Sequence, residues 1–383
     1  MESDECRRPK LLFFVTEDWY FASHRLPLAA AAVKEGYEVV LVTRVDRHLE
    51  EITRHGIRVI PTNMSRSGLS PLKEMASLSE LRRIYKAERP DIVHHVALKP
   101  VIYGSLIARS LGITGVVNAL GGLGYVYSSK RLKARLLRPG ISQALKLALG
   151  GRNTHVILQN TDNKDQLVRE GFTKKQNIHL IRGAGVDVTE YEKSPPPESA
   201  EPLVILPARL LRDKGIEEFI QAAILLKARG IKARFALVGK PDNANPNSVP
   251  EAKIECWAKE KIIEYWGWRD DMSKVLAQAA IVCLPSYAEG LPKSLLEAAA
   301  SSRAIVTTDI PGCREIVQHG VNGWLVPSCD IPALTSALEE AINNPDLCAK
   351  YGTEGRRMVK SDFSLDYVIA ETLGIYHKVL EHK

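Results

Sequence analysis

Short apolar runs rich in β-branched residues alternate with longer stretches of helical periodicity along almost the whole chain. In the first half, the runs that predict strands are LLFFV, EVVLVT, RVIP, DIVHH, GVVNAL, HVILQN and IHLI. The second half repeats the pattern with LVILPA, RFALVG, IIEYWG, AIVCLP, AIVTT and GWLVP. Helices are expected between them, for example over Leu26 to Glu35 and Pro71 to Glu88. Such alternation is typical of parallel sheets wrapped by helices.

A proline-rich polar stretch, KSPPPESAEP, separates the two halves and has the composition of a semi-rigid linker. We therefore expect an α/β protein with two Rossmann-like, doubly wound domains. The expected divisions are residues 1–190 for the first domain, 191–202 for the linker, 203–363 for the second domain and 364–383 for a C-terminal helix that packs back on the first domain. Open sheets of this kind bind ligands beyond the carboxyl ends of their strands, so the cleft between the domains is the expected active site.

Composition excludes several classes of protein. The 383 residues are 45% hydrophobic and 25% charged, as in ordinary soluble domains rather than disordered or collagen-like chains. No apolar run is long enough to span a bilayer, and the run that follows the first ten residues is too short for a signal peptide, so we expect a cytoplasmic protein. The six cysteines are widely spaced and indicate neither a zinc site nor a disulfide framework.

The net charge of +7 comes from one segment. Residues 92–161 contain nine Lys and Arg and no Asp or Glu, and the rest of the chain has 43 basic and 45 acidic residues. The positive residues are densest in an amphipathic segment that carries Lys130, Arg131, Lys133, Arg135 and Arg138. This pattern favours docking on an anionic membrane surface over a solvated basic helix. Few aromatic residues interleave with the basic run, which argues against nucleic acid as a partner.

The segment SYAEGLPKSLLEAAA contains the most informative chemistry. A strand runs into a loop with Glu289, and Pro292 then opens a helix that carries Glu297. Backbone N–H groups near the helix start, around Leu291, Lys293 and Ser294, would offer a site for a diphosphate. Carboxylates at Glu289 and Glu297 would accept hydrogen bonds from the hydroxyl groups of a sugar.

The loop after the first strand of the second half carries two cations, Arg209 and Lys214, in LPARLLRDKG. In a doubly wound sheet this loop opens onto the same site. Two fixed cations would stabilise the charge on a departing diphosphate, the role that a metal often takes. The chain has no Asp-x-Asp sequence and no His and carboxylate cluster at ligand spacing, so we expect neither a metal nor another cofactor.

These motifs together resemble the retaining glycosyltransferases of family 4, which have the GT-B fold. The resemblance rests on EGLPKSLLEA with its two glutamates, ARLLRDKG, RGAGVD and PGCREIVQHGVNGWLV, and it spans nearly the whole chain. In the first half, SHRLPLA, DIVHHVALKP and VNALGGLGYVY are similar to the bacterial branch that extends polyprenyl-diphosphate-linked sugars. The resemblance implies a retaining, metal-independent enzyme.

The same resemblance implies roles for individual residues. Glu289 would hold the donor sugar and Glu297 the ribose of the nucleotide, while Arg209 and Lys214 would grip the diphosphate. The backbone of Gly290, Leu291, Pro292, Lys293 and Ser294 would cradle sugar and phosphate. The base would meet backbone groups near Trp268 and Arg269, although the Trp268 side chain itself, like that of Trp266, is expected to pack rather than to stack on a ligand.

Contacts to the acceptor are harder to assign. Many relatives place a histidine after a first-domain strand near the reacting carbon, whereas GVVNALGGLGY has none. The candidates are His24, Lys99, Asn118, Gly121 and Gly122. The glycines either cradle phosphate or turn the chain. Of the adjacent His94 and His95, at least one is expected to be a core residue.

We therefore expect a hexosyltransferase that uses a nucleotide sugar, with UDP as the expected nucleotide, and a polyprenyl-diphosphate-linked acceptor sugar in O-antigen, capsule or glycan biosynthesis. It would be peripheral on the cytoplasmic face of the cell membrane. One alternative is an enzyme on the same scaffold with a soluble acceptor, or a nucleotide-sugar epimerase. Another is a non-catalytic module that binds membranes or polyanions.

Overall fold

The computed structural model describes residues 7–64, 71–121, 132–191, 201–242 and 245–381. The chain forms two compact units. Unit 1 contains Met1–Ala184 and Val368–Lys383, and unit 2 contains Gly185–Tyr367. The division between them falls at Ala184 and Gly185, earlier than the boundary expected after residue 190, because Val186 already pairs with Ser364 of unit 2.

Unit 1 is built on a parallel sheet with seven described strands in the order β3-β2-β1-β4-β5-β6-β7. The strands are β1 (Lys10–Glu17), β2 (Glu38–Arg44), β3 (Arg58–Pro61), β4 (Ile92–Val96), β5 (Gly115–Leu120), β6 (Thr154–Leu158) and β7 (Ile178–Leu180). The strand order reverses between β1 and β4, and the segments that follow these two neighbours therefore lead to opposite faces of the sheet.

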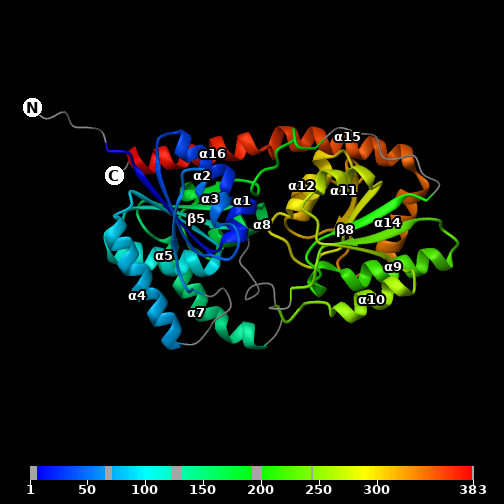
Figure 1. Cartoon of the computed structure of the whole chain (residues 1–383), viewed down its shortest axis with the longest axis horizontal. Helices are drawn as coiled ribbons and strands as arrows, with labels where there is room; N and C mark the ends of the chain where they lie inside the picture. The colour runs from blue at the N-terminus through cyan, green and yellow to red at the C-terminus, as the bar shows by residue number, and fades with distance from the viewer. Residues whose placement is uncertain (1–6, 65–70, 122–131, 192–200, 243–244, 382–383) are drawn as a thin grey trace, which may run out of the picture. The chain divides into compact units, whose positions relative to one another are not determined.

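Helices cover both faces of this sheet (Figure 1). One face carries α1 (Asp18–His24), α2 (Leu26–Lys34), α3 (Leu49–Thr53) and the C-terminal helix α16 (Leu365–Glu381). The other carries α4 (Pro71–Glu88), α5 (Leu98–Ser110), α7 (Leu132–Leu149) and α8 (Thr161–Arg169). Alternate residues of β1 point to the two faces: Leu11 and Phe13 to the first, Leu12 and Phe14 to the second. Burial on both faces explains the continuous apolar runs in the sequence.

Helix α16 completes the core of unit 1. Tyr376 and Val379 are fully buried in the cluster that includes Phe13 and Phe21. The Tyr376 hydroxyl lies 2.5 Å from Nδ1 of His94 on the central strand β4. The last helix of the chain is therefore an integral part of unit 1 rather than an appended tail.

Unit 2 repeats the design with six described parallel strands in the order β10-β9-β8-β11-β12-β13. They are β8 (Leu203–Pro207), β9 (Arg234–Val238), β10 (Glu264–Gly267), β11 (Ile281–Leu284), β12 (Ala304–Thr308) and β13 (Gly323–Val326). The reversal of strand order lies between β8 and β11. Both sheets confirm the predicted fold class of two doubly wound parallel-sheet domains.

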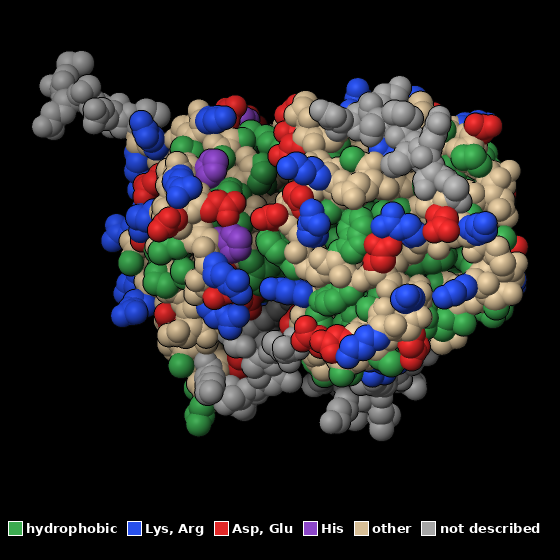
Figure 2. Space-filling view, turned by 45° about the vertical axis from the view of Figure 1, so that its right-hand side comes forward, with side chains coloured by type: hydrophobic (Ala, Val, Ile, Leu, Met, Phe, Trp, Pro, Cys, Tyr) green, Lys and Arg blue, Asp and Glu red, His purple; other side chains and the backbone are tan. Residues whose placement is uncertain are grey.

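The helices of unit 2 also form two layers (Figure 1). On one side of the sheet lie α9 (Ile216–Ala228), α10 (Glu251–Lys259) and α14 (Ile331–Asn343). On the other lie α11 (Met272–Gln278), α12 (Lys293–Ala300) and α15 (Pro345–Asp362), and the short α13 (Cys313–Ile316) follows β12. On the visible face of this unit, acidic and basic side chains are interspersed (Figure 2).

Candidate functional site

The strand order of unit 2 brings two charged loops together. The loop after β8 carries Arg209 and continues into a short 3₁₀ turn over Arg212–Lys214, and the loop after β11 carries Glu289. Because β8 and β11 are neighbours, the two loops leave the sheet at the same edge, at the switch point of the fold. This is where an open α/β sheet binds its ligand.

Glu289 is the centre of a small polar cluster at this edge. Its Oε1 atom accepts hydrogen bonds from Nζ of Lys214 and from Oγ of Ser286, the latter at 2.7 Å. Only 17% of the Lys214 side chain and 11% of the Glu289 side chain are exposed. Two largely buried opposite charges are thus compensated by each other and by a hydroxyl donor.

Two glycines allow the loops to approach closely enough for this contact. A Cβ atom on Gly215 would lie 2.1 Å from the carbonyl oxygen of Pro285, and one on Gly312 would lie 2.3 Å from the carbonyl oxygen of Gly290. Both residues also have positive φ angles, of 71° and 85°. A side chain at either position would push the loop that carries Glu289 away from its neighbours.

Helix α12 begins where the sequence predicts, with Pro292 as its N-cap and Lys293 as its first residue. The first-turn amides of a helix have no acceptor within the helix, and its positive end attracts anions. Gly290 and Leu291 precede this end, and Ser294 lies in its first turn. The structure therefore places a helix N-terminus directly after the loop of Glu289.

Glu297 lies one turn inside α12 and is buried, with 8% of its surface exposed. Burial raises the pKa of its carboxyl group, and this effect is opposed by Lys293, whose Nζ lies 3.5 Å from Oε1, and by a side-chain hydrogen bond with Tyr191. Tyr191 was not among the residues that the sequence singled out. Its position follows RGAGVD closely, but nothing in that pattern connects it with a residue more than a hundred positions later.

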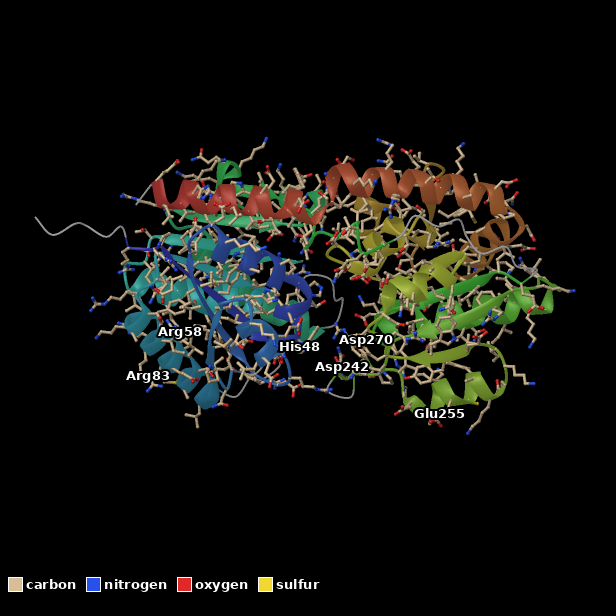
Figure 3. All side chains as sticks on the ribbon, turned by 45° about the horizontal axis from the view of Figure 1, so that its top comes forward. His48, Arg58, Arg83, Asp242, Glu255 and Asp270 are labelled. Atoms are coloured by element: carbon tan, nitrogen blue, oxygen red, sulfur yellow. The ribbon has the colours of Figure 1, made fainter. Side chains whose placement is uncertain are left out.

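The second predicted cation, Arg209, has a partner that the sequence did not reveal. Its Nη1 atom donates to Oδ2 of Asp242 at 3.0 Å. Asp242 follows β9 and Asp270 follows β10, and both are labelled in Figure 3 at the carboxyl end of these neighbouring strands. This contact uses one of the five N–H donors of the Arg209 guanidinium.

The predicted base-contact region follows β10. Arg269 forms a two-pronged ion pair with Asp271, with both N to O distances at 2.7 Å. Trp266 is half-buried and donates to Glu264 at 2.9 Å, whereas Trp268 is 63% exposed, with Nζ of Lys240 at 6.0 Å from its ring centre. The exposure of Trp268 contradicts the expectation that it is a packing residue, because it lies in the loop beyond the end of the strand.

Of the first-domain candidates, the structure places Asn118 in the core. It is fully buried on β5, and its Oδ1 atom lies 2.8 Å from Nδ1 of His95 and 3.0 Å from Oγ of Ser105. His94 and His95 are both fully buried as well. A ligand cannot reach the Asn118 side chain in this arrangement, so its candidacy as an acceptor contact is corrected to a structural role.

The other candidates lie at or near the carboxyl end of the unit 1 sheet. His24 ends α1 and stacks on Tyr20, with ring centres 4.3 Å apart. Lys99 lies in the first turn of α5 and donates to Glu74 at 2.8 Å. Gly121 directly follows β5, and Gly122 lies outside the described residues.

The predicted membrane segment is only partly described. Lys130 and Arg131 lie outside the described residues, Lys133 and Arg135 belong to α7 with side chains outside the description, and Arg138 is half-buried on the same helix. Across the described ranges, no helix has both the length and the apolar character that crossing a bilayer requires. Within the same ranges, no three His, Cys, Asp or Glu side chains gather as metal ligands would.

Comparisons with known proteins agree on one family. The model described as "Glycosyl transferases group 1" matches residues 187–358, which contain every unit 2 candidate, and "Glycosyl transferase 4-like" matches residues 10–161. A relative from Campylobacter jejuni is 29% identical over 78% of this chain and 80% of its own length. It is named N,N'-diacetylbacillosaminyl-diphospho-undecaprenol alpha-1,3-N-acetylgalactosaminyltransferase. A UDP-Gal:alpha-D-GlcNAc-diphosphoundecaprenol alpha-1,3-galactosyltransferase from Escherichia coli is 23% identical over 79% of the chain and 80% of its own length.

Solved structures share the fold. WaaG, a glycosyltransferase involved in lipopolysaccharide biosynthesis, superimposes with a TM-score of 0.73 at 14% identity, over 96% of this chain and 99% of its own. HepE of Anabaena, in complex with UDP-glucose, gives a TM-score of 0.73 at 19% identity, over 95% and 99%. The fold is thus GT-B, and the two family models together match most of both units. The chain is therefore a GT-B glycosyltransferase whose residues 187–358 belong to the group 1 family and whose residues 10–161 belong to the glycosyl transferase 4-like family.

Proposed function

We propose that this glycosyltransferase transfers a hexose or N-acetylhexosamine, with retention of configuration, from a UDP-sugar to a polyprenyl-diphosphate-linked sugar. The observation that carries the proposal is the contact between Lys214 and Glu289 at the switch point of unit 2, with Arg209 in the same loop as Lys214. A carboxylate that recognises sugar hydroxyls is thereby fixed beside cations that suit a diphosphate.

In the proposed reaction, the bond between the anomeric carbon and the diphosphate oxygen breaks while an acceptor hydroxyl attacks from the same face. Negative charge grows on the departing diphosphate and is stabilised by Arg209, by Lys214 and by the N-terminus of α12. The acceptor's proton passes to the departing diphosphate oxygen. These cations take the place of a metal, so the reaction needs no metal ion.

The donor is held along the same edge. Glu289 accepts hydrogen bonds from the sugar and Glu297 from the ribose, while backbone groups from Gly290 to Ser294 contact sugar and phosphate. The uridine base lies against the backbone near Trp268 and Arg269. Support for the nucleotide comes from HepE, a protein of the same fold that was solved with UDP-glucose.

The proposed acceptor is a polyprenyl-diphosphate-linked sugar. Its support is that both relatives described above carry undecaprenol-diphosphate sugars in their names. A lipid-linked acceptor requires the enzyme at the cytoplasmic face of a membrane, where Lys130, Arg131, Lys133, Arg135 and Arg138 would meet anionic headgroups. On unit 1, His24, Lys99 and the glycines at 121 and 122 are the proposed acceptor contacts.

One donor and acceptor screen tests the function. The protein is mixed with UDP-sugars and a short polyprenyl-diphosphate sugar in the presence of EDTA, and products are identified by mass spectrometry. A lipid-linked product with an α-anomeric linkage by NMR supports the proposal. A product that forms only with a soluble acceptor contradicts the proposed lipid-linked acceptor. An epimerised nucleotide sugar contradicts the proposed transfer reaction. Loss of activity in EDTA contradicts the proposed independence from metal.

Membrane docking has its own test. Neutralising Lys130, Arg131, Lys133 and Arg135 should release the protein from vesicles that contain anionic lipid, since each cation near the surface contributes about 1 kcal/mol. Neutral vesicles should bind neither form. If the neutralised variant binds anionic vesicles as the native protein does, the docking surface lies elsewhere. Vesicle binding without any transfer would favour a non-catalytic membrane-binding module.

A further inference from the structure

The first segment of unit 2 is bonded to the backbone that joins the end of α15 to the start of α16. The N–H of Val186 donates to Phe363 at 3.0 Å, and its carbonyl oxygen accepts from Leu365 at 3.0 Å. Gly185 passes so close that a Cβ atom there would lie 2.7 Å from the Cα of Leu365. The backbone at Gly185 and Val186 is therefore fixed against the backbone of residues 363–365.

Arg356 of α15 fastens the other end of this segment to α12. Its Nη1 atom donates to the carbonyl oxygens of Tyr191, at 2.7 Å, and of Ala300, the last residue of α12. Its Nη2 atom donates to the carbonyl oxygen of Val188 at 3.3 Å. A single planar guanidinium thus joins residues 188–191 to the helix that carries Glu297.

The Tyr191 side chain is therefore packed in the core of unit 2, and its hydroxyl group lies beside the carboxyl group of Glu297. Tyr191 is 6% exposed and Glu297 is 8% exposed, and the two side chains share a hydrogen bond. Burial and the nearby Glu297 raise the pKa of the Tyr191 hydroxyl, so this group stays protonated and acts as the donor. A carboxylate has about four acceptor positions, so the remaining ones stay available to a ligand.

We propose that Tyr191 is a positioning residue of the donor site, whose hydroxyl holds the Glu297 carboxylate in the orientation that accepts hydrogen bonds from the nucleotide ribose. This inference rests on the proposed function, in which Glu297 binds the ribose. Tyr191 itself touches no substrate. Phenylalanine at this position would keep the packing and lose only the hydrogen bond.

The charges around Glu297 give the proposal a pH signature. The groups that act on it are Lys293 on its own helix and Tyr191 and Glu190 on the segment beside it. Burial raises the pKa of Glu297 and Glu190 adds to the rise, whereas Lys293 and Tyr191 lower it. Without the Tyr191 hydroxyl, the pKa of Glu297 rises further, and its ionised form is lost at a higher pH.

The test measures UDP binding to the full-length protein by calorimetry between pH 5.5 and 8. Tyr191→Phe should weaken UDP binding about tenfold or more at pH 7, the size expected for a lost hydrogen bond to a charged group. The acid limb of the binding curve should also move to higher pH. Tyr351→Phe is the matched control, because Tyr351 is a buried tyrosine of the same unit that packs on Trp324 at 4.8 Å. It should bind UDP as the native protein does, and melting temperatures check the fold of both variants.

A double-mutant cycle shows whether Tyr191 acts through Glu297. Adding Tyr191→Phe to Glu297→Gln should cause little further loss of UDP affinity and no further pH shift. If the two losses add, or if Tyr191→Phe alone changes neither affinity nor pH dependence, Tyr191 is not a positioning residue. Failure of the native protein to bind UDP would instead overturn the proposed function itself, so the two failures are distinguishable.

Discussion

Lys214 donates a hydrogen bond to Glu289 across 75 positions of the sequence, and the same carboxylate oxygen also accepts from Ser286. Neither partner of this pair is well solvated. Removal of one partner therefore leaves the other as an uncompensated, largely buried charge, which proteins tolerate poorly. The pair links the loop after β8 to the loop after β11. Under the proposed function these loops hold the diphosphate and the sugar, so each residue would influence both parts of the donor.

Lys214→Ala and Glu289→Ala should each lower turnover by about 100-fold or more, because each removes one electrostatic contact to the reacting donor. The measurement is kcat with the donor found in the product screen. Lys253→Ala provides the control: Lys253 pairs with Glu217 at 2.7 Å on the exposed surface of the same unit, and its loss should leave kcat unchanged. Near-native turnover in either site variant would refute the role assigned to that residue.

The patterns that located this pair were local ones. Runs such as LVILPA and AIVCLP identify strands because both faces of a parallel sheet are buried, and the charged residues just beyond these runs must then lie at one edge. The partners of Arg209 and Glu297 could not be predicted, because their contacts are not local in the sequence. Asp242 and Tyr191 reach the site through contacts between distant segments, and no spacing in the sequence encodes such a contact.

Asn118 shows a second limit. In a strand buried on both faces, periodicity does not separate a polar side chain that points to a ligand from one that is satisfied inside the core. The structure resolves the question, because the Asn118 amide lies beside His95 and Ser105 within the interior. The exposed Trp268 is the reverse case, because this aromatic residue was expected to pack against other side chains and instead lies exposed beyond the end of its strand.

Gly312→Ala should displace the loop of Glu289. The new Cβ would lie 2.3 Å from the carbonyl oxygen of Gly290 and 2.8 Å from that of Glu289, at a φ of +85°. We expect the free energy of unfolding to fall by about 2 to 4 kcal/mol and turnover to fall with it. Gly320→Ala separates the two causes, because Gly320 has a φ of +75° but no atom within 4 Å of its would-be Cβ. The free energy of unfolding of Gly320→Ala should fall by about 1 kcal/mol, and the variant should keep full activity. Equal losses of stability in both variants would show that the close approach of Gly312 to the Glu289 loop is unimportant.

Two buried histidines should make unit 1 sensitive to acid. Burial lowers the pKa of His94 well below its usual value, with Arg25 and His95 adding to the effect, and lowers the pKa of His95 to about 4. Below pH ~6.5 the unfolded chain therefore binds protons that the folded chain does not. The free energy of unfolding should fall as the pH drops from ~6.5 to ~4, by up to ~1.4 kcal/mol per pH unit for each histidine.

Urea denaturation between pH 4 and 8 measures this slope. His95→Gln should reduce it, since glutamine cannot take up a proton, although the variant will be less stable at pH 7 through its altered contacts with Tyr85 and Asn118. His55→Gln, on the exposed surface of the same unit, should leave the slope unchanged. A slope that is the same in all three proteins would mean that His95 does not contribute to the acid sensitivity.

Asp18 should fix the loop after β2, at the carboxyl end of the unit 1 sheet. The carboxylate is fully buried, and its Oδ2 atom accepts from the amides of Asp46, Arg47 and His48 at 2.7, 3.0 and 3.0 Å; Figure 3 labels His48. Burial alone would raise the pKa of Asp18, but these backbone hydrogen bonds, with a further one from Trp19, hold it below its usual value. The stabilisation is therefore complete above pH ~4 and is lost as the pH falls through the lowered pKa.

Asp18→Asn should lower the free energy of unfolding at pH 7 by about 2 to 3 kcal/mol, because it removes charge-assisted hydrogen bonds and leaves buried amides with a weaker acceptor. The difference from the native protein should narrow below pH ~4, because the Asp18 carboxylate of the unfolded chain takes up a proton there and the folded one does so only at its lowered pKa. Asp46→Asn changes an exposed carboxylate in the same loop, 61% of whose side chain is accessible, and should have almost no effect. If Asp18→Asn lowers the free energy of unfolding by the same amount at pH 3 as at pH 7, the ionised carboxylate does not hold the loop. The side chain would then act through its shape alone.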